Sequence, residues 1–229
     1  FKGHFALAHG RCHPLGVLDD HSRYALAMQA CPDQQAETVQ ACFTRLFRRH
    51  GLPWRILADN GSPWGSAGGE HYTGLGVWLL DLEVGLVHGR PCHPETQGKE
   101  ERLHRTLARE LLDGCCFRDL AAAQAGFDAW RAIYNLRRPH EALGLDTPAS
   151  RYRPSAREMP ATIAPPEYDS RHPVRLVDRG GWISFRNRRG YCGKAFAGRP
   201  VALSPTQTDG LFDIRYRSHL IAQLNLRQP

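Results

Sequence analysis

The chain has 229 residues, of which 41% are hydrophobic, so it is long enough for one full-sized domain and a smaller one. Lys and Arg outnumber Asp and Glu by 30 to 23, which gives a formal net charge of +7 and excludes an acidic protein. This balance fits a polyanionic partner such as nucleic acid, although charge alone does not identify one.

Membrane insertion and a zinc site are both disfavoured. The longest apolar run, LGVWLLDLEVGLV, is interrupted by Asp81 and Glu83, so we expect no membrane-spanning helix. The seven cysteines form no C-x-x-C pair, which predicts a reduced, cytoplasmic setting. Because the sequence begins at Phe1, without a methionine or an apolar leader, we expect it to be part of a longer protein.

The first part of the chain predicts strands and one helix. Short apolar segments bounded by turn residues predict a meander of three strands, over residues 4–8, 14–20 and 23–30. Apolar residues at helical spacing predict a helix over 34–50, which Gly51 and Pro53 end. A strand over 54–58 follows and carries Asp59 at its carboxyl end.

Strands and helices then alternate. A glycine-rich loop over 61–74 precedes a short helix over 75–80 and a fifth strand over 84–89. Two further helices are expected, one within 93–111 and one over 120–136. Strands first, and then strand–helix alternation, is typical of an α/β sandwich.

A proline-rich segment divides the chain. Residues 146–172 lack a periodic apolar signal, so we expect a linker between a domain over 1–145 and a second domain over 173–229. The second domain holds short alternating runs, which predict a small all-β barrel of about five strands. The runs cover residues 174–177, 182–185, 194–198, 199–204, 211–216 and 220–226.

The segment HPETQGKEERLHRTLAREL places carboxylates inside a basic helix. At about 100° per residue, one face is apolar and includes Glu100, the opposite border is basic, and Glu101 lies between them. The apolar positions are Leu103, Leu107 and Leu111, and the basic ones are Arg102, Arg105 and Arg109. Glu101 is therefore either a metal ligand beside phosphate-binding arginines or half of a surface pair with Arg105.

The segment LADNGSPWG supplies a second candidate ligand. Asp59 follows a predicted buried strand, and the carboxyl edge of an α/β sheet is where ligands usually bind. The alternative is that Asp59 only begins a turn with Asn60 and Gly61. A hard divalent cation needs oxygen ligands from separate elements, so a strand-end Asp and a helix Glu make a plausible pair.

Four motifs together carry a family resemblance: LDDHSRYAL, FRRHGLPWRILADNGSPWG, HGRPCHPETQGKEERLHRTL and YNLRRPHEALGLDTPASRY. From Phe1 to about Tyr152 the chain resembles the integrase catalytic core of insertion-sequence transposases, the branch related to retroviral integrases. The resemblance implies a ribonuclease H-like fold, with a mixed five-stranded sheet and flanking helices, followed by an SH3-like barrel.

The resemblance also implies an Asp-Asp-Glu triad that holds two Mg²⁺ or Mn²⁺ ions. The second Asp falls on Asp59, and the Glu falls on Glu101, so both are expected to be catalytic and metal-binding. The first Asp would immediately precede Phe1, and this chain alone is therefore expected to be inactive. Neither Asp19 nor Asp20, which lie in a turn, is expected to replace it.

Several residues are candidates for DNA contact. The resemblance and the basic stripe point to Lys99, Arg102, Arg105, His93 and Gln97, and a crowded turn in the barrel adds Arg186, Arg188 and Arg189. Arg137, Arg138 and His140 fit the end of a helix better than a DNA contact, and Trp64 fits core packing better than base stacking.

The function implied is that of a DNA transposase, which cleaves and joins strands of transposon ends and target DNA. Partners would be DNA and further copies of the chain, with no membrane, in the bacterial cytoplasm at the nucleoid. One alternative is a catalytically inactive DNA-binding or assembly module from a decayed or truncated transposase. Another is a nuclease of the same fold, which would cleave DNA without joining it.

Overall fold

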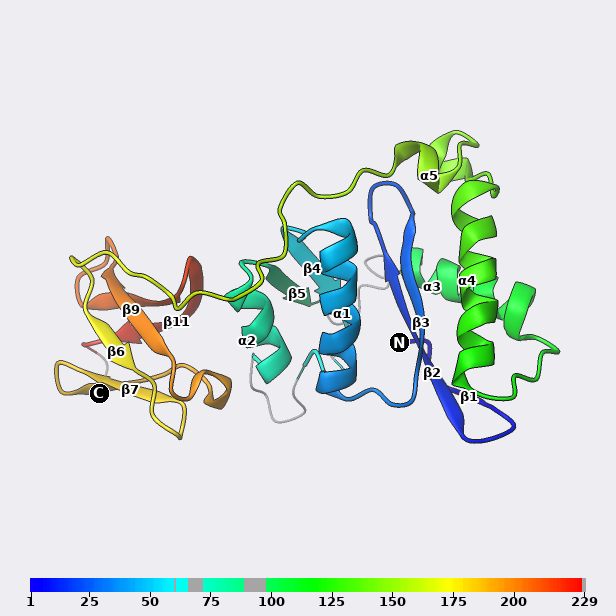
Figure 1. Cartoon of the computed structure of the whole chain (residues 1–229). Coiled ribbons are helices and arrows are strands. Elements are labelled where there is room, and N and C mark those ends of the chain that lie inside the picture. Colours follow the sequence, from blue (N-terminus) through cyan, green and yellow to red (C-terminus); the bar gives the residue numbers. More distant parts are fainter. Residues whose placement is uncertain (60, 66–71, 89–97, 228–229) are drawn as a thin grey trace. The chain divides into compact units, whose positions relative to one another are not determined.

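The computed structural model describes most of the chain, namely residues 1–59, 61–65, 72–88 and 98–227 (Figure 1). It divides into two compact units, each built from two stretches of sequence. The first unit comprises Phe1–Gly51 with Gly89–Glu158, and the second comprises Leu52–His88 with Met159–Pro229. No helix in the described part of the chain is long and apolar enough to cross a bilayer.

The first unit contains the predicted meander. Strands β1 (Phe5–Ala6), β2 (Arg11–Leu18) and β3 (Ala25–Cys31) pair antiparallel in the order β1-β2-β3. The first strand is shorter than predicted, because the chain leaves the sheet after Ala6. The N–H of Ala8 then donates to the carbonyl of Phe117 at 2.9 Å.

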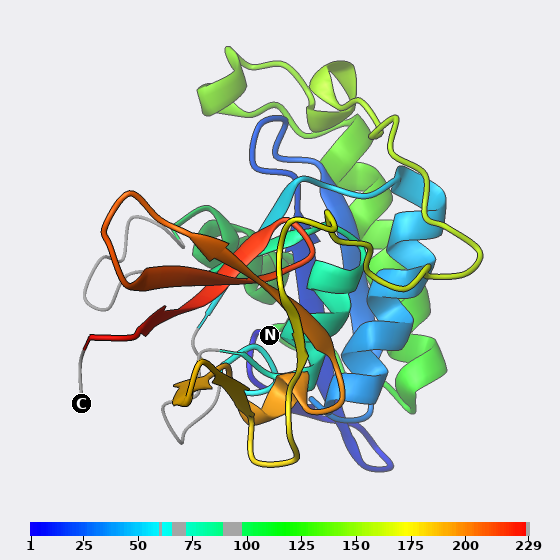
Figure 2. The ribbon, with the colours of Figure 1, turned by 90° about the vertical axis from the view of Figure 1, so that its left-hand side faces the viewer.

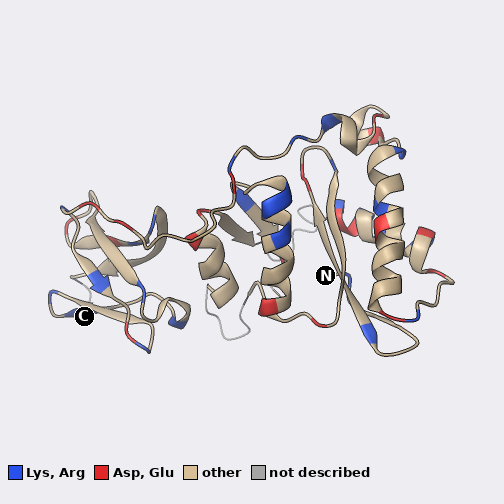
Figure 3. Cartoon of the chain, in the orientation of Figure 1, with Lys and Arg blue, Asp and Glu red and all other residues tan. Residues whose placement is uncertain are grey.

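Helices of the first unit begin and end close to the predicted residues. They are α1 (Ala36–His50), α3 (Gly98–Leu107), α4 (Leu120–Leu136) and α5 (Pro148–Arg151), with a π-helical turn over Ala108–Leu112 and a 3-10 turn over Glu141–Leu143. Gly51 ends α1 at φ 76°, and the Asp119 side chain caps α4 by accepting from the Ala122 N–H at 2.9 Å. Acidic Glu37 in the first turn of α1 and basic residues in its last turn suit the helix dipole (Figure 3).

Side chains of α4 cover the free edge of β3. Asn135 accepts from the Ala25 N–H at 2.8 Å and donates to the Ala25 carbonyl at 3.0 Å. Gln124 accepts from the Ala30 N–H at 2.8 Å. An exposed strand edge invites pairing with other chains, so these bonds both satisfy the backbone and hold α4 against the sheet. Beneath them, Leu103 and Leu107 of α3 and Phe127 of α4 are each 0% exposed.

The second unit begins with a parallel strand pair. Strands β4 (Arg55–Ala58) and β5 (Gly85–His88) pair in parallel and are connected through α2 (Gly74–Asp81). All five strands predicted for the core are present in order. Among the described residues they form a three-stranded antiparallel sheet and a two-stranded parallel sheet, rather than the single five-stranded sheet that was expected.

The rest of the second unit is all-β, as predicted (Figure 2). Its strands are β6 (Val174–Leu176), β7 (Trp182–Phe185), β8 (Arg188–Tyr191), β9 (Pro200–Pro205), β10 (Leu211–Tyr216) and β11 (His219–Asn225). They form a sheet in the order β11-β10-β9-β6 and a separate β7-β8 hairpin. No closed barrel forms within the described ranges, so the SH3-like barrel is not confirmed.

Two local predictions in this region are wrong. Residues 194–198 were expected to form a strand, but Lys194–Phe196 is a 3-10 turn, because it lies between Gly193 at φ 106° and Gly198 at φ 76°. The arginine-rich turn instead contains strand β8. Only Arg186 and Asn187 form the turn, with φ of 48° and 61°, which is the backbone of a tight two-residue hairpin.

A buried carboxylate joins α2 to the carboxyl-terminal strands. Asp81 is 7% exposed and accepts a hydrogen bond from the Tyr216 hydroxyl. The guanidinium of Arg199 lies 3.0 Å from the same carboxylate, and that of Arg217 lies 3.5 Å from it. Around this network the apolar core combines side chains of α2 with those of β7, β9, β10 and β11. Tyr168, in the expected linker, donates to the Pro200 carbonyl at 2.7 Å.

Candidate metal and nucleic-acid site

Asp59 lies directly after β4, at the carboxyl end of the parallel pair, and it is exposed. Its Oδ1 accepts from the Gly61 N–H at 3.0 Å, so the residue does begin a turn, as the simpler interpretation expected. The neighbouring strand brings His88 beside it, with Nδ1 3.0 Å from the Asp59 carbonyl oxygen. The sequence analysis did not single out His88, which becomes a neighbour only through the register of Ala58 with His88.

Glu101 lies on the exposed side of α3, next to the buried stripe. The expected surface pair between Glu101 and Arg105 is not among the ion pairs of the described residues. The residue before Glu101 has other surroundings. Glu100 is half-buried, and its Oε1 lies 3.7 Å from Nε2 of His104. The two adjacent glutamates therefore have different surroundings, and Glu101 is the one that faces solvent.

The two carboxylates belong to different compact units, Asp59 to the second and Glu101 to the first. Within the described part of the chain, no group of three or more His, Cys, Asp or Glu side chains is arranged to hold a metal ion. The free cysteines that the structure describes include none arranged as a metal site. Carboxylate oxygens are nevertheless the ligand type that Mg²⁺ prefers.

The predicted phosphate contacts of α3 differ in their surroundings. Lys99 pairs with Asp20, with 2.6 Å between Nζ and Oδ1. Arg102 and Arg105 are exposed, and Arg102 faces a pocket. His93 and Gln97 lie outside the described residues.

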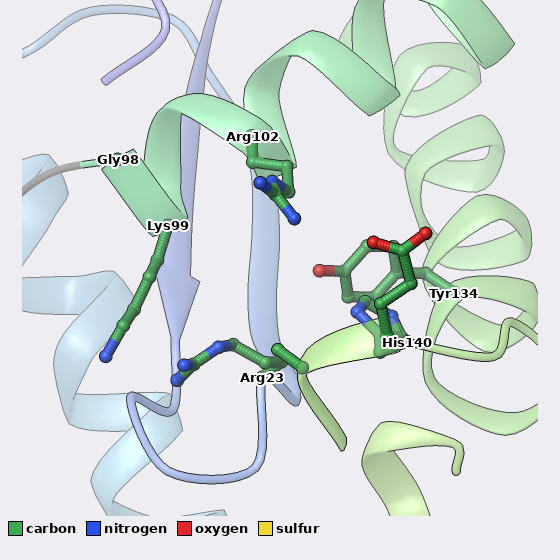
Figure 4. Close-up of a pocket in the computed structure, with 8 residues that line it drawn as sticks. Arg23, Gly98, Lys99, Arg102, Tyr134 and His140 are labelled. Atoms are coloured by element: carbon green, nitrogen blue, oxygen red, sulfur yellow. The ribbon is translucent and has the colours of Figure 1, made fainter. Parts of the chain in front are cut away.

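The pocket has a volume of about 320 Å³ and lies within the first unit (Figure 4). Its walls come from the turn between β2 and β3, from α3, from α4 and from the segment after α4. The lining residues are Arg23, Gly98, Lys99, Arg102, Tyr134, His140, Glu141 and Ala142. Sequence reasoning missed Arg23 and Tyr134, and it favoured a helix-end role for His140, because nothing in the order of these residues shows that they meet.

The turn that carries Arg23 is held by Asp19. The Asp19 carboxylate accepts from the Ser22 N–H at 2.8 Å and from the Ser22 hydroxyl at 2.5 Å, and Ser22 is 0% exposed. With Asp19 engaged in the turn and Asp20 paired with Lys99, both carboxylates have structural partners. That neither of them replaces a catalytic Asp stays a prediction.

Two of the pocket groups are uncharged near neutral pH, and burial reinforces this. It raises the pKa of Tyr134 to about 12, so the side chain retains its hydroxyl proton. Burial also lowers the pKa of His140, and the nearby charges of Arg138, Arg23 and Arg102 lower it further. The positive charge of the pocket therefore comes from its arginines and lysine rather than from histidine.

The carboxyl-terminal arginines lie against aromatic rings. The guanidinium of Arg186 lies 5.2 Å from the centre of the Phe185 ring, and that of Arg189 lies 5.0 Å from the centre of the Trp182 ring. Arg189 also pairs with Asp178 at 3.2 Å, whereas Arg188 is an exposed residue of β8.

The other candidates have structural roles. Arg138 pairs with Glu110, and Trp64 is 5% exposed, as core packing predicts.

Two family models match the chain. One, described as an integrase core domain, covers residues 82–148, and the other, described as the carboxyl-terminal domain of IS481 family transposases, covers residues 172–229. A curated relative is the "Insertion element IS407 uncharacterized 31.7 kDa protein" of Burkholderia multivorans, 28% identical over 162 residues. That alignment covers 69% of this chain and 56% of the relative, so the chain spans little more than half of the relative's length.

Three solved structures are similar to this chain, and the first of them supports the fold. A simian T-cell lymphotropic virus intasome in complex with PP2A regulatory subunit B56 gamma matches with a TM-score of 0.50 and 13% identity, over 98% of this chain and 73% of that chain. The catalytic core of BIV integrase matches with a TM-score of 0.48 and 20% identity, over 65% of this chain and 89% of that chain. The HTLV-2 integrase catalytic core in complex with magnesium matches with a TM-score of 0.47 and 14% identity, over 64% of this chain and 88% of that chain. The two family matches and the curated relative agree in making the chain similar to insertion-sequence transposases with an integrase-like core.

Proposed function

We propose that the chain is the catalytic and carboxyl-terminal part of a DNA transposase, which cleaves and joins DNA strands with divalent metal ions. The observation that carries the proposal is the place of Glu101. It is exposed on α3, between Lys99 and Arg102, inside the segment that matches the integrase core. Asp59, exposed at the carboxyl end of β4, is the proposed second ligand.

The residues fit Mg²⁺ or Mn²⁺ by their chemistry. Both side chains offer hard oxygen ligands to solvent, and no Lys or Arg of the described segments forms an ion pair with either. An integrase core in complex with magnesium is among the similar structures. When bound, two such ions would activate a water or a DNA 3′-hydroxyl and neutralise charge at the phosphodiester.

The remaining work of the chain is to hold and orient DNA. On α3, Lys99 and Arg102 flank the two glutamates in sequence and Arg105 lies one turn after Glu101, and these basic side chains would hold backbone phosphates. On the β7-β8 hairpin, Arg186, Arg188 and Arg189 would hold a second stretch of backbone. We further propose that several copies assemble on paired DNA ends in the bacterial cytoplasm, since an intasome is among the similar structures.

A catalytically inactive DNA-binding or assembly module is the second candidate. The resemblance assigns the third carboxylate to a position immediately before Phe1. The decisive protein is therefore the chain with one Asp added there.

The test is a strand-transfer assay. The chain with and without the added Asp is incubated in Mn²⁺ with supercoiled plasmid and a labelled duplex oligonucleotide that has a free 3′-hydroxyl. We expect label to join the plasmid only with the added Asp, and Glu101→Gln to abolish joining. Nicking without joining would indicate a nuclease, and DNA binding with neither reaction would indicate the inactive module.

A further inference from the structure

The pocket of the first unit carries an excess of positive charge. Of the described residues that line it, Arg23, Lys99 and Arg102 are basic, and Glu141 alone is acidic. In Figure 4 the guanidinium group of Arg102 and the hydroxyl group of Tyr134 point into the space between α3 and the turn, and the guanidinium group of Arg23 extends along the turn toward the end of Lys99. Like charges that face one cavity repel each other unless an anion lies between them.

The two guanidinium groups lack the carboxylate partner that three other arginines of the same unit have. Arg131, Arg138 and Arg151 each form an ion pair with a carboxylate. Across the described segments, neither Arg23 nor Arg102 has an ion pair or a side-chain hydrogen bond. Five N–H donors on each planar head are thus directed to solvent or to a ligand, and such a fork matches the oxygens of a phosphate.

The backbone of Arg23 is held in a conformation that arginine rarely adopts. Its φ is 61°, and its N–H donates to the Asp19 carbonyl at 2.9 Å. The neighbouring Ser22 is fixed by two hydrogen bonds to the Asp19 carboxylate. A turn that keeps a costly conformation at a charged residue fixes where its side chain leaves the backbone before any ligand arrives.

Neutral polar atoms complete the wall. Tyr134 is 5% exposed, and its hydroxyl faces the pocket (Figure 4). Nε2 of His140 is buried, and it has no hydrogen-bond partner within the described residues. Its ring packs edge-on against Tyr134, with 4.9 Å between ring centres, which fixes its orientation. Buried polar atoms without partners mark a place where a ligand or water completes the hydrogen bonds.

We propose that this pocket binds one backbone phosphate of DNA, with Arg23 and Arg102 as a charged clamp and the Tyr134 hydroxyl as a neutral donor. The volume of about 320 Å³ is at the small end of ligand pockets, which suits a phosphate with its sugar. The proposal rests on the proposed function, which supplies DNA as the source of the phosphate. It adds Arg23, Tyr134 and His140 to the contacts expected from α3.

The test measures binding of a labelled DNA duplex of about 20 base pairs to the full chain in EDTA, by fluorescence anisotropy, from about 50 to about 200 mM KCl. The variants are Arg23→Asn, Arg23→Lys and Arg102→Gln. Asn tolerates positive φ, so Arg23→Asn removes the charge without adding strain to the turn. The control is Arg48→Gln, which removes one exposed arginine of α1 in the same unit.

We expect Arg23→Asn and Arg102→Gln each to weaken binding about tenfold and to reduce the slope of log affinity against log salt by about 1. Arg23→Lys keeps the charge, so it should restore the slope but only part of the affinity. Arg48→Gln should weaken binding about threefold or less. Glu141→Gln, which removes the acidic group of the lining, should strengthen binding.

Three results would overturn the proposal. If wild-type chain binds the duplex and Arg23→Asn has no more effect than Arg48→Gln, the pocket proposal fails and the proposed function stands. If calorimetry shows that inorganic phosphate binds wild type but not Arg23→Asn, while duplex binding is unchanged, the pocket serves free phosphate rather than DNA. If wild-type chain does not bind duplex at all, the proposed function fails together with the pocket.

Discussion

Replacing Asp81 by Asn should destabilise the second unit strongly. The Asp81 side chain is 5% exposed and holds two guanidinium groups, that of Arg199 at 3.0 Å and that of Arg217 at 3.5 Å. Removing one partner of a buried ion pair costs about 3–5 kcal/mol when the other charge is left without compensation. The cost here should be lower, because Arg199 is 42% exposed and the Asn oxygen can still accept from Tyr216.

We therefore expect a loss of about 2–3 kcal/mol, which for a chain of this size lowers Tm by about 5–10 °C. Thermal unfolding of the full chain, followed by circular dichroism, measures the shift. The matched control is Asp209→Asn, because Asp209 also pairs with an arginine, Arg227, but is 82% exposed. It should cost less than about 1 kcal/mol. Equal shifts for the two variants would refute the claim that Asp81 joins α2 to the carboxyl-terminal strands.

Two further predictions concern stability. Burial, with a smaller contribution from the positive charge of Lys2, lowers the pKa of His104 to about 4, so the folded protein resists protonation of a ring that titrates near 6.5 when unfolded. The free energy of unfolding should be highest above pH 6.5 and fall by about 2–3 kcal/mol toward pH 4. Urea unfolding across that range should show the loss in wild type, and a His104→Gln variant with the same loss would contradict it. Gly181→Ala should cost more than about 3 kcal/mol, since φ is 87° and a Cβ would lie 2.6 Å from the Gly193 carbonyl carbon. Gly198→Ala, with φ 76° but no described atom within 4 Å of a Cβ, should lower the free energy of unfolding by only about 1 kcal/mol. Equal losses for the two variants would argue against the close approach of Gly181 to the Gly193 backbone.

The order of elements could be predicted because each depends on local pattern. The stripe with Leu103 and Leu107 predicts α3, and both residues are 0% exposed. The predicted ends of strands and turns were wrong where contacts with residues distant in the sequence determine them. The sequence cannot show that Ala8 pairs with Phe117 rather than with a strand, and this pairing shortens β1. Nor does FRNRRGYCG reveal that Arg186 and Asn187 both adopt positive φ, which turns an apparent long turn into a hairpin.

The candidate site could be predicted in part for the same reason. Asp59 and Glu101 stand out because a strand end and an amphipathic helix are local signals, and both lie exposed where those signals placed them. Arg23, Tyr134 and His140 belong to a turn, a helix and the segment after it, and their shared pocket arises only from tertiary packing. The segment DDHSRY predicts a turn, but it does not predict that Arg23 adopts a positive φ.

The central claim, that Glu101 is a metal ligand of a transposase active site, is tested most directly by calorimetric titration of Mn²⁺. The proteins are the chain extended by one Asp before Phe1, without further change and with Glu101→Gln or Glu100→Gln. Because Glu101 is exposed while Glu100 is half-buried beside His104, we expect Glu101→Gln to abolish Mn²⁺ binding and Glu100→Gln to preserve it. Mn²⁺ binding that survives Glu101→Gln, or that is absent from the extended chain itself, would contradict the assignment.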